Sequence, residues 1–403
     1  MRNNRIPLVS KQYLLPFILV SSLFFIWGFA RSILDVLNKH FQQTMDITIA
    51  RSSMIQATTY IGYFLMAIPA GLFLTRYGYR KGVVAGLLFF ALGAFLFIPG
   101  EAGATFEIFL VALFIIGCGL VMLETAANPY ITELGDRATA ASRLNLAQAF
   151  NGLGCLLAPA AVGQFLLSPD GEGRVALPYT VMGIIVLLVA FLFSRVKLPE
   201  IGDDKEEKDK GELTVRKTLV QLIGNRRFIT GVGALFFYEI AEISINSLFI
   251  NYVTSDGWLA PSTAAVVLSF GGLGLFLLAR IAGSAVMSRI RAEKVLIFCT
   301  AMTVVSSLLV VLNVGIASRA GLFCCYAFEA IIFPTIFALS VRGLGNATKL
   351  ASSLLMMTPL GGAIGTMIMG TVADAVSISA SFTVPCVAYL IVFLYSLTRR
   401  RLS

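Results

Sequence analysis

The residues best placed to do chemistry in this chain are acids that interrupt long apolar stretches. Glu124 is the clearest case, because it follows an uncharged run that begins after Glu107. A carboxylate at the depth of a lipid bilayer costs about 2.5–3.5 kcal/mol to insert, so such a group faces a partner or a water-filled cavity. We therefore interpret Glu124 as a group that binds a cation or carries a proton. A hydrogen bond between helices is the alternative use of this side chain.

A second acid stands beside a cation in the first apolar stretch. Arg31 and Asp35 are four residues apart and are therefore neighbours on one face of a helix. Two interpretations stay open: a self-neutralising pair near the membrane edge, or a titrating carboxylate in a cavity that Arg31 tunes. In the second, the charge of Arg31 favours ionised Asp35, which leaves Glu124 as the main titrating group. If the cation is Na+, Asp35 is the leading ligand.

Amide side chains form a stripe further along the chain. Asn145, Gln148 and Asn151 recur at every third residue. Amides offer hydrogen-bond donors and acceptors without charge, which suits a ligand that carries several hydroxyl groups. Contact between neighbouring helices is the alternative role. The stripe favours a polyhydroxylated substrate.

Further ionisable residues interrupt the apolar stretches of the second half. Glu239 and Glu242 lie about one helical turn apart, and Asn246 follows one turn later. Two adjacent buried acids repel each other if both ionise, so one is expected to be paired or protonated. Glu329 lies in a later stretch, and Arg280 is expected to pair with one of these acids.

The composition places all of these residues in membrane helices. Of 403 residues, 57% are hydrophobic and 13% are charged, whereas soluble proteins carry about 25% charged residues. A helix needs about 20 apolar residues to cross a bilayer, and twelve such segments can be placed. The predicted spans cover residues 14–38, 52–75, 82–100, 104–132, 142–168, 177–196, 228–253, 262–288, 294–316, 320–341, 350–373 and 379–398.

The basic residues indicate orientation. Most of the 31 Lys and Arg residues fall at the two termini or in every second loop. The positive-inside rule then places both termini in the cytoplasm. The net charge of +9 is thus a topology signal and does not indicate nucleic-acid binding. The chain has no HExxH motif and no phosphate-binding glycine loop, so we expect neither an enzyme nor a cofactor or resident metal.

A charged run of mixed sign divides the chain. Residues 199–217 are expected to form a cytoplasmic linker between a six-helix N-terminal half, 1–198, and a six-helix C-terminal half, 218–403. Six plus six spans is the layout of the major facilitator fold, an all-α integral membrane architecture. The loop from Gly71 to Lys81 resembles the signature loop of that superfamily, with Thr75 where Asp is usual.

Three further segments carry a closer resemblance. Residues 123–130, 143–151 and 333–337 resemble the fucose–galactose–glucose:cation symporters of the major facilitator superfamily. The resemblance implies that Asp35 and Glu124 carry protonation and substrate coupling. It also implies that Gln148 and Asn151 line a sugar cavity. Arg31, Phe333 and Glu242 depart from the residues of the fucose-transporting members, which leaves the sugar and the ion open.

Together these observations predict a secondary active transporter of the bacterial inner membrane. It would import a monosaccharide of glucose, galactose or fucose type with a cation, H+ before Na+, by alternating access, as a monomer in the lipid bilayer. A proton-driven exporter of a drug or metabolite is the alternative function. The expected sugar contacts are Gln148, Asn151, Asn145, Asn128, Glu242 and Asn246, with Phe333 or Trp27 against the ring. The expected salt-bridge and gating residues are Arg31, Arg280, Glu329 and Glu239.

Overall fold

The computed structural model describes residues 9, 11–103, 105–135, 140–167, 173–196, 212–287, 290–342, 344 and 347–400. All regular structure in these ranges is helical. Twelve helical stretches are long and apolar enough to cross a membrane. The chain is therefore a multi-pass membrane protein, as predicted. Of the predicted linker, residues 199–211 lie outside the described ranges, and residues 212–217 begin a helix.

The helices fall into two sets of six spans. The N-terminal half contains η1 (Lys11–Tyr13), α1 (Leu14–Met45), α2 (Ile49–Ser52), α3 (Met54–Tyr77), α4 (Tyr79–Phe95), α5 (Phe97–Gly103), α6 (Phe106–Glu133), α7 (Ala140–Leu166) and α8 (Ala176–Arg195). The C-terminal half contains α10 (Arg226–Ser255), α11 (Pro261–Val267), the π-helical segment η3 (Leu268–Leu273), α12 (Gly274–Met287), α13 (Ala292–Leu312), α14 (Ile316–Glu329), α15 (Ile332–Val341), α16 (Thr348–Leu355), α17 (Leu360–Ala375), α18 (Ile378–Ser381) and α19 (Thr383–Arg400). Helix α9 (Glu212–Gly224) precedes α10.

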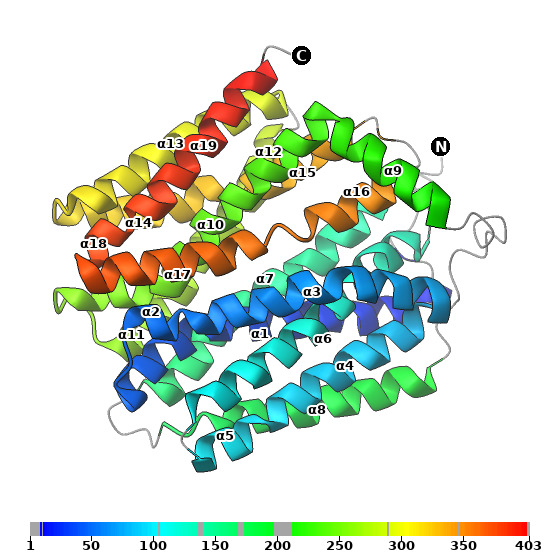
Figure 1. Ribbon diagram of the computed structural model, residues 1–403, viewed down its shortest axis with the longest axis horizontal. Helices are drawn as coiled ribbons and strands as arrows, with labels where there is room; N and C mark the ends of the chain where they lie inside the picture. The colour runs from blue at the N-terminus through cyan, green and yellow to red at the C-terminus, as the bar shows by residue number, and fades with distance from the viewer. Residues whose placement is uncertain are drawn as a thin grey trace, which may run out of the picture.

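The bundle has two distinct ends. Both chain termini and α9 lie at one end, and the short helices α2, α11 and α18 lie at the other (Figure 1). We call these the termini end and the loop end. A span that leaves the termini end in α1 arrives at the loop end at α2, and α10 runs in the same direction as α1. The position of a residue along α1 or α10 therefore shows how far it lies from the termini end and from the loop end.

Two spans of the C-terminal half are broken at prolines. Pro334 has no N–H, so the carbonyl of Ala330, four residues earlier, loses its helical partner. The tenth span accordingly divides into α14 and α15 beside Ala330. Pro359 similarly frees the carbonyl of Leu355, which accepts a hydrogen bond from the Thr358 hydroxyl at 2.7 Å. The eleventh span divides there into α16 and α17.

Helices α1 and α7 pack at backbone distance. A Cβ atom added to Gly28 would lie 2.2 Å from the Asn151 carbonyl oxygen, and one added to Gly154 would lie 2.2 Å from the Phe25 carbonyl oxygen. No side chain fits into such a gap, so glycine is required at both positions. The two helices therefore form one closely joined pair.

Candidate functional site

A cavity of about 580 Å3 lies between the two halves. Helices α1, α3 and α7 line it from the N-terminal half, and α10, η3 and α12 line it from the C-terminal half. Several residues predicted for the site are brought together here although they are far apart in the sequence. These are Arg31, Asp35, Gln148, Asn151, Glu242, Asn246 and Arg280.

Arg31 joins the two halves through an ion pair. Its Nη2 atom lies 2.8 Å from Glu242 Oε2 and 3.8 Å from Glu239 Oε2. The interpretation of Arg31 and Asp35 as a self-neutralising pair is therefore wrong: among the described residues, the ion pairs of Arg31 are with α10. The reason is topological, since α10 faces α1 across the cavity and presents two acids to a single guanidinium.

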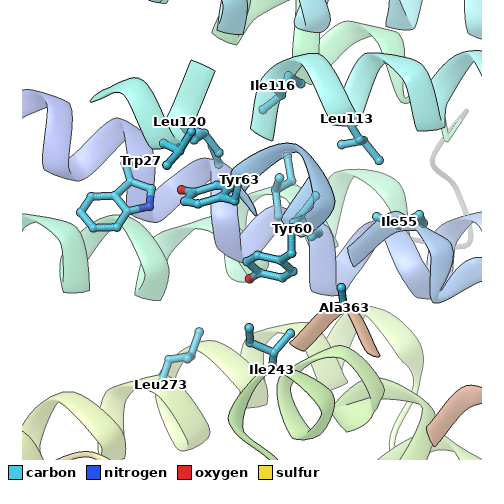
Figure 2. Packing of buried hydrophobic residues seen from close by; sticks show 14 of the residues in the cluster. Trp27, Ile55, Tyr60, Tyr63, Leu113, Ile116, Leu120, Ile243, Leu273 and Ala363 are labelled. Atoms are coloured by element: carbon cyan, nitrogen blue, oxygen red, sulfur yellow. The ribbon is translucent and has the colours of Figure 1, made fainter. Parts of the chain in front are cut away.

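Tyr60 fixes the other edge of the Arg31 guanidinium. Arg31 Nε donates to Tyr60 Oη at 3.1 Å. Figure 2 shows Tyr60 reaching from α3 towards Ile243 and Leu273 of the C-terminal half. Tyr60 is only 4% exposed although it lines the cavity. The cation is thus held on one side by a phenol of its own half and on the other by a carboxylate of the opposite half.

The amides of the site make contacts of two kinds. Asn246 Nδ2 donates to Glu242 Oε1 at 3.4 Å, and Gln148 Nε2 donates to Asn128 Oδ1 at 3.4 Å. Asn151 Nδ2 donates to the Phe24 carbonyl at 3.1 Å and so also joins α7 to α1. The alternative role foreseen for the stripe, contact between helices, thus applies to Asn151 alongside its place in the cavity wall. The Asn145 side chain lies outside the described residues.

Glu124 lies in α6, outside the cavity lining. It is partly buried, within electrostatic range of Tyr63 and Arg31. No hydrogen bond or ion pair to Glu124 occurs among the described residues. Trp27 lies near Tyr63 and Leu120 (Figure 2). Neither Trp27 nor Asn128 lines the cavity within the described part of the chain.

Arg280 does not pair with an acid in the described part of the chain, contrary to the prediction. Its Nε atom donates to the Ala330 carbonyl at 3.0 Å, and its guanidinium lies 4.5 Å from the centroid of the Phe276 ring. Ala330 is the residue whose carbonyl Pro334 leaves without a helical donor. The Ala330 carbonyl needs a donor because Pro334 breaks the tenth span. Arg280 supplies that donor and therefore bonds to the backbone and not to a carboxylate.

The remaining predicted residues lie behind the cavity wall. Glu329 is fully buried and accepts a hydrogen bond from Tyr389 Oη, while its Oε1 atom has no partner among the described residues. Phe333 packs against Tyr238, with ring centroids 6.1 Å apart. Glu239 is 3% exposed. These side chains are therefore placed to act on the site indirectly, unlike the residues that line it.

The lining residues that were not identified from the sequence include three with polar side chains, Gln56, Tyr60 and Cys155. Helical spacing could have found them, because Gln56 and Tyr60 are four residues apart and Cys155 follows Asn151 by four residues. The segment from Gln56 to Tyr60 also follows the first acid-bearing span directly.

Comparison with known proteins identifies the family. The sequence matches the Major Facilitator Superfamily over residues 20–358. The chain belongs to this superfamily. It is 34% identical over 413 residues to the L-fucose-proton symporter of Escherichia coli (strain K12), covering 96% of this chain and 93% of that protein. It is 33% identical over 387 residues to a glucose/galactose transporter of Brucella abortus (strain 2308), covering 93% and 92%.

A solved structure supports the same conclusion. A major facilitator transporter crystallised in the outward conformation is 33% identical, covers 96% of this chain and 99% of its own, and superposes with a TM-score of 0.73. These relatives are transporters and not enzymes. The predicted family and the fold of two six-helix halves are therefore confirmed.

The loop end of this major facilitator protein is closed by uncharged side chains. Asn38 Nδ2 donates to Ser247 Oγ at 2.7 Å, and Asn251 Nδ2 donates to Gln42 Oε1 at 2.6 Å. Gln42 Nε2 also donates to Asn38 Oδ1 at 2.9 Å and to Ser52 Oγ at 2.8 Å. We call these five residues the amide layer. They tie α1 to α10 about two to three helical turns beyond Arg31 along α1.

A rim contact lies outside the amide layer. The Asp374 carboxylate at the end of α17 accepts hydrogen bonds from the backbone N–H groups of Ile49 and Ala50, at 3.0 and 2.7 Å. Asp374 therefore lies at the loop end and not at the termini end. The hydrogen bonds between the halves given above, together with that from Gln164 Nε2 to the Ser262 carbonyl at 3.0 Å, lie at the level of Arg31 or nearer the loop end. Major facilitator proteins open one end at a time, and here the loop end is the closed one.

Proposed function

We propose that the chain imports a monosaccharide by symport with a cation, H+ before Na+. The observation that carries the proposal is the cavity between the halves, whose polar lining includes amides and carboxylates from both sides. Sugars present many hydroxyl donors and acceptors, which such a lining can satisfy. The printed names of the relatives, an L-fucose-proton symporter and a glucose/galactose transporter, support this substrate class.

In this proposal one group of residues contacts the sugar and another couples its transport to the cation. Gln148, Asn151, Asn246 and Glu242 contact sugar hydroxyls from α7 and α10. Asp35 takes part in cation coupling from the cavity wall, and Glu124 does so from α6. Glu124 is the stronger candidate for the proton, because Arg31 is one helical turn from Asp35 and favours the ionised form of that acid.

The orientation follows from the basic residues. We place the termini end in the cytoplasm and the loop end outside the bacterial inner membrane. Residues 1–198 and 218–403 then move as two halves about the linker 199–217, in a monomer. In this orientation the closed loop end seals the cavity from the exterior.

The test is sugar transport into proteoliposomes. Counterflow with labelled D-glucose, D-galactose and L-fucose identifies the substrate, and the transported sugar is then followed under an imposed pH gradient or an imposed sodium gradient. We expect accumulation with the pH gradient. Accumulation driven by sodium alone at constant pH would overturn proton coupling and make Asp35 the leading sodium ligand. Absence of counterflow with all three sugars would contradict the substrate class.

A further inference from the structure

Two acids on α10 compete for one cation. Glu239 and Glu242 are three residues apart and so lie on the same face of the helix. Arg31 Nη2 is bonded to Glu242 at 2.8 Å, whereas its distance to Glu239 is 3.8 Å, beyond a hydrogen bond. Glu239 Oε2 is buried and has no hydrogen-bond partner among the described residues. A shift of the guanidinium by about 1 Å would exchange one acid for the other.

The two acids differ in their access to the cavity. Glu242 lines the cavity, and Glu239 does not. A ligand that enters the cavity can therefore reach Glu242, which Arg31 hydrogen-bonds, but it cannot reach Glu239, which makes only the longer ion pair with Arg31. Because hydroxyl groups donate to carboxylates, a sugar competes with Arg31 for Glu242.

Displacing Arg31 without a second acceptor would be costly. Arg31 is partly buried, with 33% of its side chain exposed, and removing its acceptor would leave its charge without a partner at the cavity wall. Tyr60 holds the Nε edge of the guanidinium at 3.1 Å, so the Nη end can swing while the side chain stays anchored. The guanidinium is thus anchored at Nε by Tyr60, is hydrogen-bonded to Glu242, and has a second acid, Glu239, within ion-pair distance but not hydrogen-bonded to it.

We infer that Glu239 is a positioning residue that receives Arg31 when substrate takes Glu242. Arg31 then pairs with Glu239 in the loaded site and with Glu242 in the empty one. The inference rests on the proposed function for its ligand, a monosaccharide. It assigns to Glu239, which touches no substrate, a role in substrate affinity.

The exchange can be tested without ligand through a stability cycle. Glu239→Gln and Glu242→Gln each leave Arg31 one acid, so each single variant should melt within about 2 °C of the wild type. The double variant removes both acids. Its melting temperature should fall by several times the sum of the decreases in the two single variants. Additive shifts would overturn the inference, because they would mean that Arg31 does not move from one acid to the other.

The second arm measures sugar binding by calorimetry, using whichever of D-glucose, D-galactose and L-fucose binds the wild type. Glu239→Gln should raise Kd about tenfold, because the displaced guanidinium has no acceptor. Its melting temperature without sugar should stay near that of the wild type, and its sugar-induced rise in melting temperature should shrink. A purely structural role would instead lower the melting temperature without sugar.

Two controls complete the test. Glu239→Asp keeps the charge and should bind within about threefold of the wild type; weakening equal to that of Glu239→Gln would overturn a role for the charge. Asp256→Asn removes an exposed acid at the end of α10 that pairs with Arg319 at 2.9 Å, and it should leave Kd unchanged. A wild-type protein that binds none of the sugars would contradict the proposed function, while the stability cycle would still decide the exchange.

Discussion

Two contacts between α1 and α10 join the halves of the protein, one through charged side chains and the other through neutral ones. At the cavity, Arg31 bridges to Glu242 and Glu239, so the halves are joined by charge. Nearer the loop end, Asn38 and Gln42 bridge to Ser247 and Asn251, so the halves are joined by neutral hydrogen bonds. A charged contact depends on the state of its partners, whereas a neutral one can exchange its partner for water at small net cost. The cavity contact is thus the one suited to sense a ligand or a proton.

The largest effect is expected from removing Arg31, the cation of the charged contact. Arg31→Leu leaves Glu239 and Glu242 buried without their partner, which costs about 3–5 kcal/mol. We expect uptake to fall by about a hundredfold or more. The measurement is initial sugar uptake into proteoliposomes, with the amount of inserted protein as the control. Uptake at the wild-type rate would mean that the charged contact is dispensable.

The next largest effect concerns an acid outside both contacts. Glu124→Gln should abolish uphill uptake, because an amide cannot exchange a proton or bind a cation as a carboxylate does. Counterflow needs no net ion movement and should survive. If the variant accumulates sugar like the wild type, then Glu124 is a packing group and the cation must act on the charged contact itself.

The amide layer should respond more mildly. Asn38→Ala removes the bond to Ser247 and should favour opening of the loop end by about 1 kcal/mol, or about fivefold in population. Cys155 lines the cavity and can report this opening. In a protein whose other cysteines are replaced, labelling of Cys155 from the loop end should become faster. An unchanged labelling rate at that end would show that Asp374 and helix packing hold it closed without the amides.

The smallest effects separate two residues of the amide stripe. Gln148→Ala should weaken sugar binding by about threefold to tenfold without changing the melting temperature. Asn151→Ala should weaken binding and also lower the melting temperature by a few degrees, because Asn151 bonds the Phe24 carbonyl on α1. Calorimetry and thermal melting of the two variants provide the measurement. If both variants bind sugar with the affinity of the wild type, Gln148 and Asn151 serve only as contacts between helices.

The sequence predicted the parts of the molecule that depend on local pattern. The twelve spans follow from apolar length, and Asp35, Gln148 and Glu242 stand out because polar residues are rare in such segments. All three line the cavity. The fold was therefore predictable from composition and spacing. The lining of the cavity was predictable in part, from the few polar residues within the apolar segments.

Partnerships across the bundle were not predictable in this way. The sequence suggested Asp35 as the partner of Arg31 because it is four residues away, but the bonded acid, Glu242, is 211 residues away. Arg280 was expected to pair with an acid, yet it serves a carbonyl freed by Pro334. In both cases the partner is set by which helices face each other, and helical spacing carries no information about that.

The glycine contacts between α1 and α7 have a consequence for how specificity can change. Gly28 and Gly154 bring the two backbones so close that neither helix can shift without the other. The backbone positions of Arg31, Asp35 and Asn151 are therefore fixed relative to one another in one half of the site. A new sugar preference would have to be accommodated by α10 and α12, because α10 meets α1 through side-chain contacts such as the ion pair of Arg31 and Glu242. Libraries that vary those two helices alone should therefore yield altered specificity more often than libraries that vary α1 and α7.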